Sequence, residues 1–111
     1  MRASTFLQEV RKLGIRTIAG VPDSTLKPIC DAVCLDGGRE FQHYVTANEG
    51  AAVGLATGIY LAQRRPCLIY LQNSGLGNLI NPLVSIANQE VYGIPMLFVI
   101  GWRGEPGTPD E

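Results

Sequence analysis

Four polar or glycine-rich segments contain the side chains of this sequence that could carry out chemistry. They are residues 20–24 (GVPDS), 46–50 (TANEG), 72–78 (QNSGLGN) and 101–111 (GWRGEPGTPDE). Each directly follows a short apolar run of the kind that forms buried strands. Carboxyl, amide and guanidinium groups in such positions can bind a polar ligand or hold a proton, so these segments define the candidate site.

Glu49 is the side chain with the clearest alternatives. Thr46 and Glu49 have the spacing of a helix capping box, in which the glutamate only satisfies a backbone donor. The other interpretation is a carboxyl group directed into a cleft at the start of a helix. The small residues that follow, at 50–54, would let a flat ligand or another chain approach closely. Spacing alone leaves both interpretations open.

The other three segments are also open to more than one interpretation. QNSGLGN could present backbone N–H groups to a ligand, or it could simply begin a helix. It matches neither the GxGxxG nor the GxxxxGK[ST] pattern, which argues against an ordinary nucleotide-binding Rossmann domain. Asp23 or Ser24 could cap the next helix. Arg103, Glu105 and Asp110 lie among prolines and glycines, as in a flexible surface loop.

The elements that must position these segments alternate along the chain. Apolar periodicity predicts helices at residues 4–13, 24–34, 49–63 and 78–89, and compact apolar runs predict strands at 15–19, 41–45, 67–71 and 95–100. Strands joined by helices form parallel sheets. We therefore predict an α/β fold, an open parallel sheet with helices on both faces. All four segments would then lie at its carboxyl edge, where ligands bind in such sheets.

Composition narrows the possible partners. The 111 residues suit one domain, and 46% hydrophobic residues can form a core. A net charge of -1 argues against nucleic acid or an anionic membrane. The N-terminus lacks the apolar stretch of a signal peptide, and three cysteines in no framework spacing favour the cytoplasm. Cys30 and Cys34 are expected to be buried on one helix face rather than to bind metal.

The motifs together resemble a known family. GVPDS, ANEG, QNSGLGN with a following NP, and IGWRGEPG, in this order and spacing, are similar to the N-terminal, pyrimidine-binding domain of phosphonopyruvate decarboxylases. These are thiamine-diphosphate enzymes, and the alpha subunit of sulfopyruvate decarboxylase is a near relative. The resemblance extends from about Phe6 to Glu111.

The resemblance implies a decarboxylase that converts phosphonopyruvate to phosphonoacetaldehyde and CO₂. Glu49 matches the catalytic glutamate that hydrogen-bonds N1′ of the aminopyrimidine and favours the imino tautomer that removes the C2 proton. Arg103 could bind the phosphonate through two parallel hydrogen bonds. The other matched positions are Pro22, Asn73, Ser74 and Gly75, which line the cofactor, and Asp23, which lies toward the substrate.

The same resemblance implies parts that these 111 residues lack. The family binds Mg²⁺ and the diphosphate through a separate domain with a GDG…N motif, so we expect no metal ligands here. We therefore expect a truncated domain that is inactive alone. It would act with a diphosphate-binding subunit, or it would self-associate as a homo-oligomer through the Gly/Ala-rich helix at 49–63. The alternatives are a sulfopyruvate decarboxylase alpha subunit, a non-catalytic fragment, and a generic nucleotide-binding domain.

Overall fold

The computed structural model describes residues 1–109, so Asp110 and Glu111 of the C-terminal segment lie outside the described residues. The strands are β1 (Thr17–Gly20), β2 (Gln42–Val45), β3 (Cys67–Gln72) and β4 (Met96–Gly101). They form one parallel sheet in the order β2-β1-β3-β4. The helices are α1 (Ala3–Lys12), α2 (Lys27–Asp36), α3 (Glu49–Gln63) and α4 (Leu76–Ser85), with short 3₁₀ turns η1 (Ser24–Leu26) and η2 (Asn73–Gly75).

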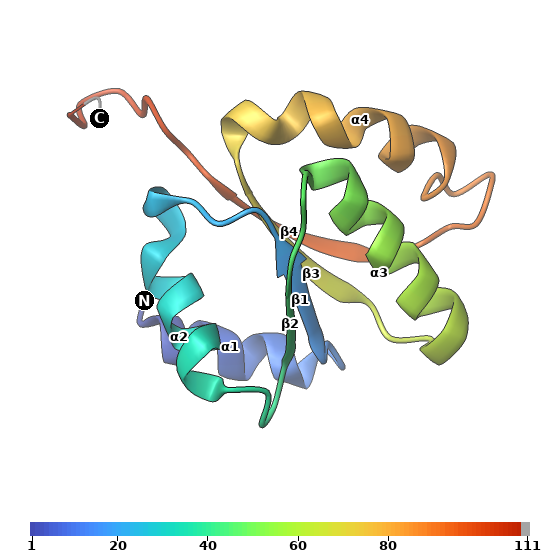
Figure 1. The fold of residues 1–111 in the computed structure, drawn as a ribbon, viewed down its shortest axis with the longest axis horizontal. Coiled ribbons are helices and arrows are strands. Elements are labelled where there is room, and N and C mark those ends of the chain that lie inside the picture. The colour runs from blue at the N-terminus through green and yellow to red at the C-terminus, as the bar shows by residue number, and fades with distance from the viewer. Residues whose placement is uncertain (110–111) are drawn as a thin grey trace.

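The sheet is the middle of three layers, with α1 and α2 on one face and α3 and α4 on the other (Figure 1). Side chains along β3 alternate between these layers, as the pleat requires. Leu68 and Tyr70 pack on the α1–α2 side, whereas Ile69 and Leu71 pack on the α3–α4 side. The predicted α/β fold, an open parallel sheet with helices on both faces, is confirmed.

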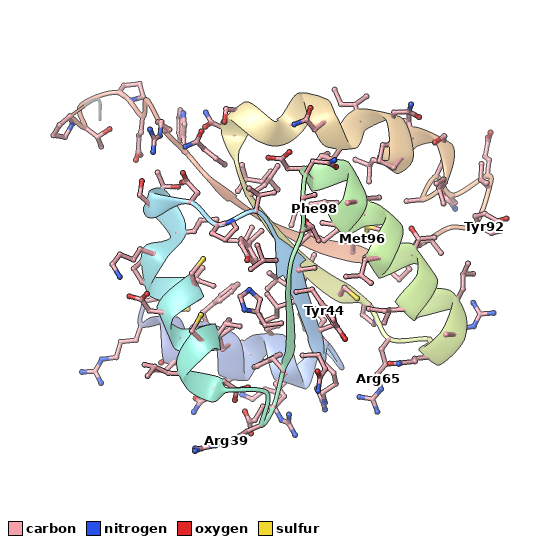
Figure 2. All side chains as sticks on the ribbon, in the orientation of Figure 1. Arg39, Tyr44, Arg65, Tyr92, Met96 and Phe98 are labelled. Atoms are coloured by element: carbon pink, nitrogen blue, oxygen red, sulfur yellow. The ribbon has the colours of Figure 1, made fainter. Side chains whose placement is uncertain are left out.

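The edge strand β4 continues this alternation. The labelled side chains of Met96 and Phe98 lie on the α3 side of the sheet (Figure 2). Leu97 and Val99 pack against the core on the opposite face. All four are only partly covered, because β4 has no strand on its outer side among the described residues.

The strand order creates a place for a site between β1 and β3. The chain goes from β1 to β2 on one side, then crosses through α3 to β3 on the other side. Ligands of open α/β sheets bind at such a reversal of direction, beyond the carboxyl ends of the strands. The segments that follow all four strands lie along the upper edge of the sheet in Figure 1. Gly20 permits the close contact of β1 with β3 there, because an added Cβ would lie 2.9 Å from the carbonyl carbon of Tyr70.

Three local predictions need correction. The helix expected at 78–89 begins earlier, at Leu76, and ends at Ser85. It stops because Asn88 forms a turn, in which its side chain accepts from the Glu90 N–H and its carbonyl accepts from Gly93. The helix expected at 24–34 is divided into η1 and α2. Cys34 is exposed rather than buried.

Within residues 1–109, no helix combines the length and the apolar character needed to cross a membrane.

Candidate active site

The turn η2 brings the predicted segments together. Each of its three residues contacts a different partner. Gly75 packs against the side chain of Glu49, Ser74 donates a hydrogen bond to Oε1 of Gln72, and Asn73 bonds to the backbone of Arg103. The turn therefore joins the site's buried part to its more exposed part.

Glu49 is a carboxyl group buried at the start of α3, with only 9% of the residue exposed. Its Oε2 accepts a hydrogen bond of 2.7 Å from Asn78 Nδ2, at the start of α4. Its Oε1 lies over Gly75, where a Cβ would collide with Oε1 and Cδ and would lie 2.8 Å from Cγ. Among residues 1–109, Oε1 has no hydrogen-bond partner. Since no buried side-chain nitrogen or oxygen of the described residues lacks a hydrogen-bond partner, Oε1 still reaches solvent, and it is the carboxyl oxygen that a ligand can bond.

The capping box is not formed, which corrects one interpretation of this segment. Asn48 is the N-cap of α3, and its Oδ1 accepts a 2.9 Å hydrogen bond from the Ala51 N–H. Thr46 instead donates to the Asn48 carbonyl at 2.9 Å. The helix begins two residues later than a Thr46 cap would require. Glu49 is therefore its first residue, and its side chain is released from capping.

Asp23 is the centre of the more exposed part of the site. Its Oδ2 accepts from the N–H of Thr25 at 2.9 Å and also from the Thr25 hydroxyl. Its Oδ1 accepts from Gln72 Nε2 at 2.6 Å and lies 3.5 Å from Nη2 of Arg103. Asp23 does cap the first turn after β1, as one interpretation predicted. It also links the ends of β1 and β3 to the C-terminal segment.

Arg103 is fixed at this place through both its backbone and its side chain. The Asn73 amide accepts from the Arg103 N–H at 3.2 Å and donates to the Arg103 carbonyl at 3.1 Å. The guanidinium donates to Ser24 Oγ at 3.0 Å. Thr25, Trp102, Arg103 and Glu105 line part of a pocket of about 340 Å³. The segment predicted as a flexible surface loop is therefore bonded to the site at Arg103.

The electrostatics of Asp23 favour its ionised form. Burial by itself raises the pKa of this carboxyl, but the hydrogen bonds from Thr25, the charge of Arg103 and the hydrogen bond from Gln72 together lower the pKa below its ordinary value. Asp23 is thus an anion throughout the neutral range.

Comparison with known proteins now places this geometry in a family. The profile of "Thiamine pyrophosphate enzyme, N-terminal TPP binding domain" matches residues 2–110. The chain belongs to this family. This match supports the thiamine pyrophosphate enzyme domain that the motifs predicted, rather than the generic nucleotide-binding domain.

The relatives of this thiamine pyrophosphate enzyme domain include two kinds of decarboxylase. The chain is 40% identical over 109 residues to phosphonopyruvate decarboxylase of Streptomyces hygroscopicus, covering 98% of the chain and 26% of that protein. It is 37% identical over 92 residues to sulfopyruvate decarboxylase subunit alpha of Methanococcus maripaludis, covering 83% of the chain and 52% of that protein. The chain thus spans about a quarter to a half of these relatives.

A solved structure has the same fold. It is the X-ray structure of a Mycobacterium smegmatis protein described as thiamin diphosphate-dependent, with a TM-score of 0.78 and 24% sequence identity. The match covers 97% of this chain and 20% of that one. This likeness supports the arrangement of strands and helices of the thiamine pyrophosphate enzyme domain.

The predicted site residues fall into three groups in the structure. Glu49 and Gly75 are in contact, and Asp23, Asn73, Ser74 and Arg103 belong to one hydrogen-bonded set. Pro22 is exposed and adds no polar contact. Gln72 and Asn78 were missed as individual residues, although they are the first and last letters of QNSGLGN. Across residues 1–109, no three His, Cys, Asp or Glu side chains are grouped so that they could hold a metal ion.

Proposed function

We propose that this chain supplies the pyrimidine-binding part of a thiamine-diphosphate-dependent 2-keto acid decarboxylase, with Glu49 as its catalytic residue. The observation that carries the proposal is the buried Glu49 carboxyl group, whose Oε1 is open beside Gly75 while Asn78 holds Oε2. The family match supplies the cofactor class.

The residues around Glu49 fit an aminopyrimidine ring. Oε1 is available to bond a ring nitrogen, and because Gly75 has no Cβ, the Glu49 carboxyl group can lie directly against η2 at the place where the ring would bind. Glu49 and Gly75 would therefore hold the ring, with Asn73 and Ser74 on the same turn and Pro22 at the end of β1 nearby in the proposed cleft. When bound, thiamine diphosphate supplies the carbon nucleophile and the electron sink that decarboxylation of a 2-keto acid requires.

The protein's own contribution is to place and share a proton. With the cofactor bound, Glu49 would hold the pyrimidine ring by a hydrogen bond through Oε1, which would adjust the basicity of the ring's amino group. Asn78 fixes the rotamer of the carboxyl group through Oε2. Since a proton-sharing side chain typically contributes about 10²–10⁴-fold to rate, Glu49 is expected to dominate the chemistry of this chain.

The substrate that we propose is phosphonopyruvate, which would give phosphonoacetaldehyde and CO₂. Phosphonopyruvate decarboxylases are the relatives at 40% identity. Asp23 and Arg103 are the proposed substrate residues, because the guanidinium lies at the pocket beyond β1 and β3 and suits an anionic head group. The second candidate is sulfopyruvate. It is favoured by the alpha-subunit relatives, of which the chain covers 52% and 60%.

The partner that we propose is a diphosphate-binding domain that also holds Mg²⁺, on a separate subunit or on a longer form of this chain. The support is the share of the relatives that this chain spans, together with relatives that are named as alpha subunits. Contact through α3 is part of this proposal, because Gly54 and Gly58 have open space around them. A cytoplasmic location and inactivity of the chain alone belong to the same proposal.

The test is CO₂ release from phosphonopyruvate by this chain mixed with a diphosphate-binding partner chain, thiamine diphosphate and Mg²⁺. Glu49→Gln is expected to lower the rate by about 10²–10⁴-fold, since the amide cannot share a proton in the same way. Glu90→Gln is the matched control. It makes the same glutamate-to-glutamine change at a residue that is exposed on the turn before β4. A thermal-shift titration with thiamine diphosphate reports binding independently of turnover.

Each outcome decides between the alternatives. Activity that needs both chains and is lost only in Glu49→Gln supports a split decarboxylase. No CO₂ release from a folded mixture that binds the cofactor rejects phosphonopyruvate, and sulfopyruvate is then assayed. Association without cofactor binding or turnover would establish the non-catalytic alternative.

A further inference from the structure

The Asp23–Arg103 pair places a hydrogen-bond acceptor next to a pocket, because Arg103 and Thr25, which both contact Asp23, line that pocket. Asp23 is largely covered, with 11% of its side chain exposed, whereas the Arg103 side chain is 40% exposed at the pocket. Of the interactions of Asp23, the 3.5 Å contact of Oδ1 with Arg103 is the longest. An anion that enters the pocket can bond the guanidinium in exchange for its 3.0 Å bond to Ser24 Oγ and its contact with Asp23, while the shorter bonds that fix the carboxylate remain.

We propose that Asp23 selects a phosphonate over a sulfonate head group by accepting a hydrogen bond from the P–OH of the singly protonated phosphonate. This proposal rests on the proposed function and names the substrate class of the same site. A phosphonate keeps one acidic proton in a substantial fraction of molecules near neutral pH. A sulfonate of the same shape has none, so beside Asp23 it presents only oxygen lone pairs to a carboxylate.

The carboxylate is fixed in position for this task. Thr25 occupies Oδ2 with two hydrogen bonds, and Gln72 holds Oδ1 at 2.6 Å. When Arg103 turns to the anion, the position it leaves on Oδ1 becomes available to the P–OH. A carboxylate that is already oriented forms such a bond at little entropic cost. Two negative oxygens in contact, as with a sulfonate, repel each other instead.

The charged groups of the described residues near Asp23 act alike on two singly charged anions, so the P–OH proton makes the difference between phosphonate and sulfonate. Arg103 supplies the only positive charge among the described pocket-lining residues, and Glu105 places a carboxylate on the pocket wall in addition to Asp23 beside it. Cys30 on α2 contacts the backbone of Asp23, and burial raises the pKa of its thiol, so it stays neutral. The lowered pKa of Asp23 keeps it an acceptor near neutral pH. A fully ionised phosphonate is repelled by both carboxylates, and the protonated form is therefore preferred.

Asn73 is the positioning residue of this arrangement. Its two hydrogen bonds fix the backbone of Arg103, so that the guanidinium can turn while the segment stays at the end of β3. The adjacent Trp102 is the only tryptophan of the chain and lines the same pocket. Its emission therefore reports occupancy directly.

The experiment titrates the full chain with methylphosphonate and with methanesulfonate and follows Trp102 emission, with calorimetry as a second readout. Wild type is expected to bind methylphosphonate about 10- to 100-fold more tightly, as for one hydrogen bond to a charged group. Asp23→Asn, whose amide can donate to either anion, should bring the two dissociation constants within about threefold. Arg103→Gln should weaken both anions.

The pH dependence of anion binding by wild type tests the proposal without any variant, so its result does not depend on whether a variant folds. The preference for methylphosphonate should fall as the pH rises through the second ionisation of this probe, while methanesulfonate binding stays constant over that range. Equal affinities in wild type, an unchanged preference in Asp23→Asn, or a preference that persists at high pH would each overturn the proposal. Absence of binding by either anion would do so as well.

These results are separable from the test of the proposed function. Anion binding here needs neither cofactor nor partner chain, whereas the role of Glu49 is judged by CO₂ release and cofactor binding. A decarboxylase that shows no anion preference would keep the function and reject the selection by Asp23. Anion selection without turnover in any mixture would keep the selection by Asp23 and reject the proposed function.

Discussion

The two parts of the site that meet at η2 are built on different physical principles. The packed corner, consisting of Glu49, Gly75 and Asn78, depends on close steric contact around one buried carboxyl group. The polar corner, consisting of Asp23, Thr25, Gln72, Asn73 and Arg103, depends on a set of hydrogen bonds near the surface. Both corners hold a carboxyl group, but among the described residues only the packed corner has a carboxyl oxygen without a protein partner, and that oxygen reaches solvent.

This difference determines which substitutions each corner tolerates. A tightly packed interior responds to a single added methyl group, because neighbouring atoms have no room to move. A hydrogen-bonded set near solvent loses only the bonds that are removed, and water replaces part of their energy. Substitutions in the packed corner should therefore have larger effects than substitutions in the polar corner.

Among changes to the residues around Glu49 and Asp23, the largest effect is expected from Gly75→Ala. The backbone at Gly75 has φ −86°, which alanine accepts, so the change tests packing alone. The new Cβ would collide with the Glu49 carboxyl group and displace it. We expect CO₂ release with the partner chain to fall about 10²-fold, as for a displaced catalytic group, and unfolding free energy to fall by about 1–3 kcal/mol.

Gly77→Ala is the matched control for this change. Gly77 lies two residues further along, inside α4, and nothing lies within 4 Å of a Cβ added there. Alanine in a helix is more favourable than glycine by about 1 kcal/mol, so this variant should be as stable as wild type or more so. Equal losses of activity in both variants would show that α4 tolerates no change and that contact with Glu49 is not the cause.

A smaller effect in the same corner is expected from Asn78→Ala. The variant removes the 2.7 Å hydrogen bond to Glu49 Oε2 but leaves the packing around Gly75 intact. Since an intramolecular hydrogen bond contributes about 0.5–1.5 kcal/mol net, we expect a loss of activity of roughly two- to tenfold. Asn81→Ala, on an exposed part of the same helix, serves as the control. Full activity in Asn78→Ala would mean that Glu49 is oriented by its packing alone.

The sequence predicted the place of both corners, because it depends only on the general geometry of parallel sheets. Segments that follow neighbouring parallel strands must meet at the carboxyl edge, whatever their side chains are. Asp23, Asn73 and Arg103 come together for this reason, although up to 80 residues separate them along the chain. The fold class followed equally directly from alternating helical periodicity and buried apolar runs.

The atomic partners within each corner could not be predicted in the same way. The bond between Asn78 and Glu49 depends on how the first turns of α3 and α4 pack, which spacing along the chain does not specify. The capping box failed because Thr46 and Asn48 are both good N-caps, and the choice depends on where the chain leaves β2. The early start of α4 arises because η2 continues directly into it.

In the polar corner, Asn73→Ala is expected to have a modest effect. It removes both hydrogen bonds to the Arg103 backbone, and the exposed position lets water replace part of them. We expect the free energy of unfolding to fall by about 1 kcal/mol, and the Arg103 amide to exchange with deuterium markedly faster. Asn73→Asp keeps the acceptor for that amide but loses the donor, so it should show intermediate exchange. No change in exchange would indicate that the segment is held by the side chain of Arg103.

The smallest effect is expected from titrating Asp23. Burial is the largest single influence on its pKa and raises it. The hydrogen bonds from Thr25, the charge of Arg103 and the hydrogen bond from Gln72 together outweigh burial, so the pKa in the folded chain lies below the ordinary value of 3.8. A carboxyl group with a lowered folded pKa stabilises the fold fully above its ordinary value and loses this contribution as the pH falls through the lowered one. Trp102 emission should therefore stay constant from neutral pH down to about pH 4 and change only below it. Asp23→Asn, which cannot titrate at this position, should lack this acid transition. A transition near pH 5 or 6 that disappears in Asp23→Asn would instead mean that burial, rather than the hydrogen bonds of the polar corner, controls this carboxylate.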